Sequence, residues 1–402
     1  MHLTQMDSFL IRVMYLVATG MVVLTVLGAP GAASFLFTLT FFLAVLFWFA
    51  GAIRRVTWMD AILIFLVGLS LSNVIINAWA EETRVSLGYM KKYAMFICTL
   101  VFFQASIKLS IDEKTEKFLL NLNSLLAVFL IVYFYANPIT VYLMNNRVSN
   151  YLTFGFTNPN LTALFLLCFY TGELIRIARS RGIFRRLWHV FLAAYMLYFV
   201  WETESRNCLL TITAVTFLCF LLYLTKHGYR FTKGMALLIS LWPLIFFVLY
   251  MALVENAFVQ QVFAFMAKEG KGLDARIMIW RLALMYFGKS PILGAYSQIS
   301  RGTGMSQLHN THLDILTSYG VVVLILVCYM LFHMLSSKDS KNLKEETMLR
   351  ICFAGTIIMG MGEAALFSGG MGLYIFSGMF LLLCNKRQGG KYSVGQTERK
   401  LA

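Results

Sequence analysis

The sequence predicts an all-α polytopic membrane protein, with about twelve transmembrane helices in one integral membrane domain over residues 1–402. Two observations predict this class. The chain is 59% hydrophobic and only 13% charged, whereas soluble domains carry about 25% charged residues. Apolar runs of about 17–25 residues, long enough to cross a bilayer, also recur along the chain. Such a chain cannot bury its apolar surface in one water-soluble core.

The predicted spans follow one another through mostly short connections. The first run lacks a clear cleavage site, so we interpret it as a spanning helix and not as a signal peptide. The spans lie near residues 9–28, 34–52, 58–79, 93–108, 118–136, 161–178, 187–204, 207–225, 235–254, 311–334, 351–369 and 371–385.

The positions of lysine and arginine predict the orientation of these spans. If the N-terminus is cytoplasmic, alternate loops on the cytoplasmic side hold most of the basic residues, as the positive-inside rule requires. Both termini are then cytoplasmic. Basic residues also occur outside, in the 80–92 loop, at the head of the eighth helix and in the 255–310 loop. Their retention there predicts an anionic ligand at the outer leaflet.

The net charge of +15 does not indicate a nucleic-acid partner, because the chain has no basic soluble domain interleaved with aromatic residues. The 255–310 segment is the one long outer-face loop. We expect it to form short amphipathic helices that lie on the membrane or cap a cavity, and loops of this length are usually functional. The seven cysteines fall within or beside apolar runs, which indicates packing residues.

The segment from Leu308 to Gly320, LHNTHLDILTSYG, holds the two histidines expected on the outer side. His309 and Asn310 begin the tenth predicted helix, where free backbone N–H groups favour a neutral imidazole that can act as a base. A histidine at this position can instead serve only as a helix cap. His309 and His312 are three residues apart and would share a helical face. Little beyond Asp314 supports a metal site, so we predict none.

Arg206 is the second candidate. It follows Ser205 in the run TESRNCLL, between two apolar spans at their outer ends. Ionisable residues at membrane depth usually face a cavity or a partner. The alternative is an internal ion pair of Arg206 with Glu202 or Glu204.

Arg276 and Arg281 are the third pair of candidates. Arg276, Trp280 and Leu284 fall on one helical face with a spacing of four. Two arginines on separate elements, Arg206 and Arg276, have the forked donors that suit the oxygens of a diphosphate. The alternative is that Arg276 and Arg281 bind lipid headgroups along an interfacial helix, and Arg281 fits this alternative better.

Other chemistries are disfavoured by the motifs that the sequence lacks. It has no G-x-x-x-x-G-K-[ST] loop for ATP and no G-x-S-x-G nucleophile elbow. It also has no Asp-x-Asp pair on the outer side to hold Mg²⁺. Any chemistry must therefore use arginine, histidine, asparagine and backbone groups.

Four short motifs occur in this order: GFTNPN at 155–160, which includes Asn160; Ser205-Arg206; Arg276 with Ile279-Trp280, followed by SPILG at 290–294; and His309-Asn310 with Gly320 nine residues further on. Together they resemble the O-antigen ligase and polymerase superfamily of bacterial envelopes, which includes Wzy-type polysaccharide polymerases and WaaL-type O-antigen ligases. Ser290 stands where the family pattern has asparagine.

The resemblance implies an inverting, metal-independent membrane glycosyltransferase of the type C fold in the bacterial cytoplasmic (inner) membrane, with its active site facing the exterior and no cofactor. The donor would be a glycan on undecaprenyl diphosphate, and a glycan or lipid would be the acceptor. Membrane lipids and a chain-length regulator would be further partners. Arg206 and Arg276 would hold the diphosphate, and His309 would orient or deprotonate the acceptor. Substrate-binding candidates are Asn310, Arg281, His312, Ser205 and Asn160.

A polymerase is the favoured member of this superfamily, because the outer loop is short for a ligase. A ligase that transfers the glycan to lipid A-core or protein is the alternative. A flippase of lipid-linked sugars would also bind diphosphate with arginines, but transporters tend to show internal repeats and charges at the midplane, and the sequence shows neither. A passive scaffold would leave Arg206, Arg276 and His309 unexplained.

Overall fold

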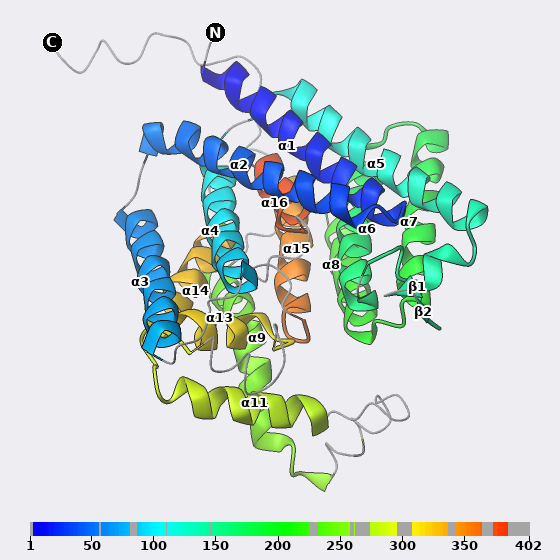
Figure 1. Cartoon of the computed structure of the whole chain (residues 1–402). Coiled ribbons are helices and arrows are strands. Elements are labelled where there is room, and N and C mark those ends of the chain that lie inside the picture. The colour runs from blue at the N-terminus through cyan, green and yellow to red at the C-terminus, as the bar shows by residue number, and fades with distance from the viewer. Residues whose placement is uncertain are drawn as a thin grey trace, which may run out of the picture.

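A computed structural model of the chain describes residues 3–55, 58–80, 87–109, 111–144, 147–156, 158–225, 232–257, 261, 274–295, 308–336, 343–363 and 373–384. These residues are almost entirely helical, in agreement with the predicted class (Figure 1). Their only strands are the two-residue β1 and β2, which pair antiparallel, with Leu143 opposite Val148 and Met144 opposite Arg147.

The first nine helices follow the predicted spans closely. They are α1 (Leu3–Val26), α2 (Pro30–Arg55), α3 (Trp58–Ala80), α4 (Leu87–Lys108), α5 (Glu113–Ala136), α6 (Pro159–Arg179), α7 (Ile183–Glu202), α8 (Arg206–Leu224) and α9 (Lys233–Leu253). A short 3-10 helix, η1 (Thr140–Tyr142), precedes β1 (Leu143–Met144) and β2 (Arg147–Val148). The later helices are α11 (Asp274–Phe287), α13 (Thr311–Tyr319), α14 (Val321–Leu335), α15 (Leu343–Met359) and α16 (Leu373–Cys384).

Side-chain caps define several of these helix starts. The Asp112 carboxylate accepts a hydrogen bond from the Thr115 N–H at 2.8 Å and begins α5. Asn158 does the same for α6 by accepting from the Asn160 N–H, and Pro159 follows at the first helical position. Asparagine and aspartate are preferred caps, and proline fits a position whose N–H would be unpaired anyway. The GFTNPN motif is therefore a helix start.

Seven of the described helices, α1, α3, α5, α6, α7, α8 and α9, are long and apolar enough to cross a membrane. Their inner faces share one large hydrophobic core with α2, α4 and the C-terminal helices. Large apolar side chains on their outer faces are exposed, such as Phe65 at 63% and Phe217 at 58%. Such exposure suits lipid and not water.

The tenth predicted span, 311–334, was wrong as a single helix. It divides into α13 and α14 at Gly320, whose φ is +92°. A Cβ at Gly320 would lie 1.8 Å from the Ile292 carbonyl oxygen. The Val321 N–H donates to the Pro291 carbonyl at 2.9 Å, and the Ala295 N–H donates to the Thr317 carbonyl at 2.7 Å. The SPILG segment therefore docks against the helix break.

The eleventh span also differs from its predicted limits. Within the described part of the 351–369 run, the helix ends at Met359, and α15 begins eight residues before the predicted start, at Leu343. Tight turns at Gly360 and Met361 end the helix, because their N–H groups donate to the carbonyls of Ile357 and Ile358. The described part of the final span is the short α16.

A buried ion pair connects α4 to α13. The Lys92 Nζ lies 2.9 Å from the Asp314 carboxylate, and each side chain is only 7% exposed. A buried charge is costly unless it is paired, so removing either partner would leave the other uncompensated. The Lys92–Asp314 pair therefore fixes the position of α13, with the residues that precede it, against α4.

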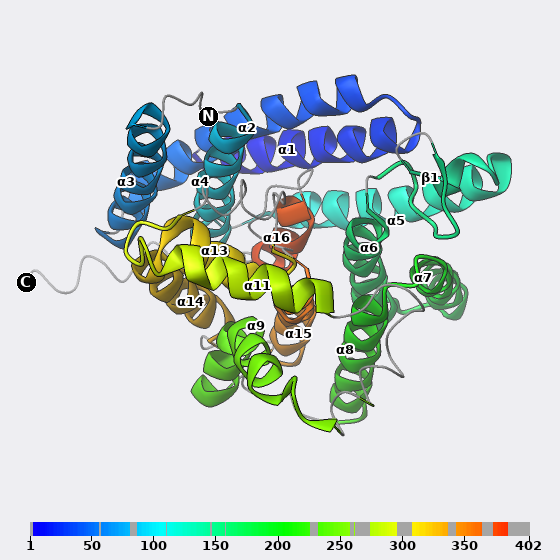
Figure 2. The ribbon, with the colours of Figure 1, turned by 60° about the horizontal axis from the view of Figure 1, so that its bottom comes forward.

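The loops that the sequence assigns to the outside come together at one end of the described structure. The Leu152 N–H donates to the Glu202 carbonyl, and the Thr311 N–H donates to the Gly360 carbonyl. α11, from the 255–310 segment, lies at this end, across α13 and α15 in the view of Figure 2. The rest of that segment is described only at 255–257, 261, 288–295 and 308–310.

We predict that Gly320→Ala lowers the free energy of unfolding by about 2 kcal/mol or more, because an alanine there takes a strained backbone conformation and collides with Ile292. Thermal unfolding of the purified protein in detergent measures this. Gly68→Ala is the matched control, since Gly68 lies within α3 and its Cβ would meet no atom within 4 Å. Equal midpoints for the two variants would contradict the prediction.

Candidate functional site

A buried carboxylate, that of Glu363, collects polar groups from three separate parts of the chain. Its side chain is 6% exposed. The Oε2 atom lies 3.0 Å from the Nδ1 atom of His309, and the Oε1 atom lies 3.7 Å from a terminal nitrogen of Arg276. Oε1 also accepts a hydrogen bond from the Asn160 side chain. Three of the predicted site residues, Arg276, His309 and Asn160, therefore meet at one carboxylate.

The turn after α15 carries Glu363 and is held on two sides. The Thr311 hydroxyl donates to the Glu363 carbonyl at 3.0 Å, and the Asn310 amide donates to the Met361 carbonyl at 3.1 Å. On the other side, the Asn207 amide of α8 donates to the Met359 carbonyl at 2.9 Å. The position of the carboxylate thus depends on the starts of α13 and α8.

His309 lies just before α13, with a φ of +53°. A non-glycine residue in the left-handed region persists only where its surroundings hold it there. The Trp280 indole N–H donates to the Leu308 carbonyl at 2.7 Å. The Trp280 ring is buried against Phe247 and Tyr250 of α9, with ring centroids 5.3 and 5.5 Å away. α11 therefore anchors the backbone next to His309.

Arg276 lies one helical turn before Trp280 on the same face of α11, as predicted. Its side chain is 37% exposed. The 3.7 Å separation from Glu363 is a loose ion pair, which leaves guanidinium N–H groups for another anion. One helix thus positions both the arginine and, through Trp280, the histidine.

Arg206 is the first residue of α8 and is exposed. Among the described residues, no ion pair joins it to Glu202 or Glu204. Glu202 instead accepts a hydrogen bond from the Tyr142 hydroxyl at 2.9 Å. Burial, with the neighbouring Glu202, raises the pKa of Tyr142 to about 12, so this phenol stays protonated. Its neighbour Asn207 contacts the end of α15, but among the described residues no contact joins Arg206 itself to Glu363, Arg276 or His309.

The expected shared face of His309 and His312 was wrong. Asn310 is the N-cap of α13, and its side chain accepts from the Leu313 N–H at 2.9 Å, so His309 lies outside the helix. His312 lies inside it, fully buried, and its Nε2 is 2.7 Å from the Ser240 carbonyl of α9. His312 therefore packs α13 on α9 and does not face Glu363.

Three other predicted substrate-binding residues lie apart from the Glu363 carboxylate. The buried Asn310 amide is used within the protein, as it donates to the carbonyls of Pro243 and Met361. Ser205 is 3% exposed, and its hydroxyl has no hydrogen-bond partner among the described residues. Arg281 is 59% exposed and lies 3.5 Å from Glu255, as an interfacial residue would.

Glu363 itself was missed from the sequence. It lies in the run that was interpreted as the eleventh span, MGEAALFSGG following a long apolar stretch. A carboxylate within a predicted span is costly and usually faces a cavity or a partner. That signal was present, and it applied to Glu363 as directly as it applied to Arg206.

This arrangement provides a base, an orienting carboxylate and cationic donors. A hydrogen bond from the Nδ1–H of His309 to Glu363 leaves Nε2 with a free lone pair that can take a proton. Arg276 supplies fixed positive charge beside this pair. Within the described part of the chain, no group of three or more His, Cys, Asp or Glu side chains could hold a metal ion.

No protein-family model and no curated protein matches the chain. The site is therefore interpreted from its own geometry.

We predict that Trp280→Phe lowers the free energy of unfolding by about 1–3 kcal/mol. Phenylalanine still places an aromatic ring there, but the Leu308 carbonyl loses its buried hydrogen-bond donor. Unfolding midpoints in detergent measure the loss. Trp79→Phe is the matched control, since Trp79 is 83% exposed on α3. An unfolding midpoint for Trp280→Phe as high as that of Trp79→Phe would mean that the indole N–H does not anchor the 308–309 segment.

Proposed function

We propose that this protein is a membrane glycosyltransferase that joins glycans carried on undecaprenyl diphosphate, as a polysaccharide polymerase of the Wzy type. The observation that carries the proposal is the meeting of Arg276 and His309 at Glu363, at the end of the molecule that holds the predicted outer loops. A cationic group and a base must lie side by side for an acceptor to attack a diphosphate-linked sugar.

In the proposed reaction, a hydroxyl of the acceptor sugar attacks the anomeric carbon of the donor from the face opposite the diphosphate. The new C–O bond forms as the C–O bond to the diphosphate breaks, and that electron pair stays on the diphosphate oxygen. The Nε2 of His309 takes the hydroxyl proton, and the Glu363 carboxylate stabilises the imidazolium that results. The configuration at the anomeric carbon is inverted.

Arg276 and Arg206 bind the diphosphate and stabilise the negative charge that grows as it leaves. Arginine suits this role because its planar fork can contact two phosphate oxygens. Donors aimed at developing charge in a site that excludes water are the largest contribution in many enzymes. α11 carries Arg276 to Glu363, which supports the idea that the 255–310 segment contributes to the donor site.

We further propose that the chain crosses the bacterial cytoplasmic membrane about twelve times in a type C-like arrangement, with both termini in the cytoplasm. Two features support this orientation. The Glu363 cluster is built from the starts of α6 and α13 and from the end of α15, which the positive-inside rule assigns to the exterior. The arginine-rich connection between α6 and α7 lies at the other end of α6.

We predict that His309→Ala lowers glycan joining by about 100-fold or more, the usual contribution of a positioned general base. The assay uses the purified protein in detergent with lipid-linked repeat units and follows the length of the product. His333→Ala, at an exposed position in α14, is the control and should retain activity.

The same experiment separates the competing functions. Chain growth from lipid-linked repeats without any other acceptor supports a polymerase, whereas transfer that requires added lipid A-core supports a ligase. If His309→Ala joins glycans normally but the donor no longer reaches the outer face in cells, the protein is a transporter and the proposal fails.

We predict that Arg276→Lys lowers the turnover rate by about tenfold or more, because a lysine keeps the charge but loses the fork that grips the diphosphate. Arg281→Lys makes the same change one turn further along α11, at a residue paired with Glu255, and should lower turnover by less than about threefold. An equal loss of turnover in the two variants would mean that Arg276 does not bind the donor.

A further inference from the structure

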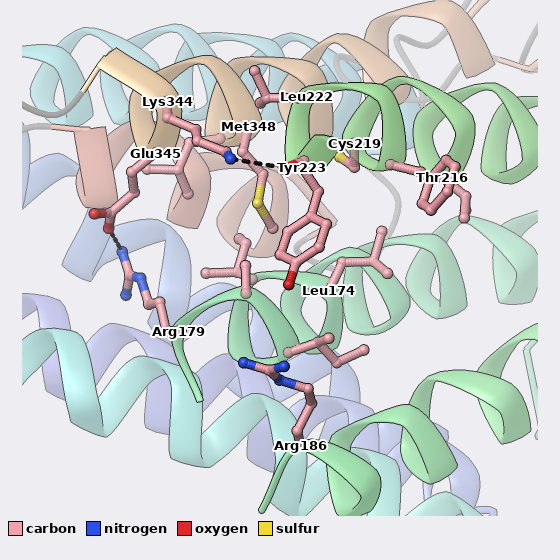
Figure 3. Close-up of a pocket in the computed structure, with 15 residues that line it drawn as sticks. Leu174, Arg179, Arg186, Thr216, Cys219, Leu222, Tyr223, Lys344, Glu345 and Met348 are labelled. Carbon is pink, nitrogen blue, oxygen red and sulfur yellow. Dashed lines mark hydrogen bonds and ion pairs between the residues drawn. The ribbon is translucent and has the colours of Figure 1, made fainter. Parts of the chain in front are cut away.

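A pocket of about 680 Å³ opens at the end of the molecule opposite Glu363. It lies between the last turns of α6, the first turn of α7, the last turns of α8 and the first turns of α15 (Figure 3). The pocket-lining Ile177 is seventeen residues beyond Asn160 on α6, about 26 Å along the helix axis. That separation is close to the hydrocarbon thickness of a bilayer, about 30 Å.

The walls of this pocket are amphipathic. Leu174, Ile177, Phe220 and Met348 supply apolar surface. Phe220 is 55% exposed, so the apolar side of the pocket is open to the membrane. A soluble anion would gain nothing from these walls, whereas the upper part of an acyl chain would bury apolar surface there.

The polar wall is cationic. Arg179 is neutralised by ion pairs with Glu116 and Glu345. Arg186 has no carboxylate partner among the described residues: it donates only to the Ser180 carbonyl, at 3.0 Å, and its Nε is buried without a partner there. Lys344 donates to the carbonyls of Tyr223 and Thr225 at 3.0 and 2.9 Å, and its Nζ lies 5.4 Å from the centroid of the Tyr223 ring. The charge of Arg186 is therefore available to an anion.

Figure 3 shows the Arg186 guanidinium and the Tyr223 ring pointing into the same space from opposite sides. The neighbouring surface is typical of the headgroup level of a membrane. Phe184 and Trp188 at the start of α7 are 85% and 48% exposed, beside the further arginines Arg181 and Arg185. Aromatic and basic residues gather together at that depth.

We propose that this pocket binds one anionic glycerophospholipid, with its phosphate on Arg186 and Tyr223 and the start of an acyl chain against the apolar wall. Basic pockets between membrane helices on the cytoplasmic side recognise anionic headgroups in this way. The lipid fills the cleft between the α6–α7 pair and the α8–α15 pair. It thereby supports the same α6, α8 and α15 whose other ends carry the Glu363 cluster. This site is separate from the proposed sugar-transfer site and does not depend on that function.

Native mass spectrometry of the full chain in detergent tests the proposal, with titrations of phosphatidylglycerol and of phosphatidylcholine. We expect one tightly bound phosphatidylglycerol, preferred over phosphatidylcholine by about tenfold or more. Arg186→Gln should lower phosphatidylglycerol affinity about fivefold, the contribution of one basic residue near a membrane surface. Arg185→Gln removes the same charge at the adjacent residue, which does not line the pocket, and should change affinity less than about twofold.

Ala178→Trp blocks the pocket without changing its charge, because Ala178 lines it at an exposed position, and should abolish the tight lipid. If Arg186→Gln fails to fold, Ala178→Trp still tests whether the lipid occupies the pocket. Equal binding of the two phospholipids would overturn the proposal, as would equal losses from Arg186→Gln and Arg185→Gln. If inorganic phosphate alone displaced phosphatidylglycerol, or if undecaprenyl phosphate bound more tightly than phosphatidylglycerol, the pocket would belong to another anion. Either result would also overturn the proposal.

Discussion

A buried carboxylate is stable only if the surrounding chain compensates its charge, and Glu363 is compensated from three directions. Arg276 of α11 and Asn160 of α6 contact its Oε1 atom, and His309, which precedes the Asn310 cap, contacts its Oε2 atom. Burying such a group without partners would cost several kcal/mol. The carboxylate therefore sets where α6, α11 and α13 can lie relative to α15, and it brings a base next to a guanidinium as a consequence.

The helix break at Gly320 is the second constraint on the site. Because Gly320 takes a left-handed conformation, the carbonyls at the end of α13 are not used by a continuing helix. Tyr93 donates to the Ser318 carbonyl at 3.0 Å, and Ser70 donates to it at 3.1 Å. The SPILG segment fills the same space, and Gly294 permits it to approach, since a Cβ there would lie 2.3 Å from the Ser318 carbonyl. Contacts at the C-terminal end of α13 thus help to fix its N-terminal end, which His309 precedes.

Much of this architecture could be predicted because hydropathy and charge are local signals. The apolar runs gave the first nine helices to within about six residues at each end. Arg276 and Trp280 were correctly placed on one face because helical spacing is regular. The cap at Asn310 was also available from the sequence, since asparagine is a preferred N-cap, but His309 was placed within the helix, whereas it lies before the cap.

The rest could not be predicted, because contacts distant in the chain decide it. A glycine in an apolar run does not by itself end a helix. Gly320 does so because Ile292 and Pro291 occupy the space that a continuous helix would need. In the same way, α15 ends at Met359 because Asn310, Thr311 and Asn207 hold the turn that follows. Once that helix is known to end, Glu363 becomes a site residue and not an anomaly within a span.

The order of the Glu363 partners along the chain has a consequence for biogenesis. Asn160, Arg276, His309 and Thr311 all precede Glu363, so a ribosome releases every partner before it releases the carboxylate that joins them. Until then Arg276 and His309 lack the carboxylate that they both contact, and the start of α13 lacks the turn that it contacts. The cluster is therefore completed among the last steps of membrane insertion, after all the other helices except α16 have been synthesised.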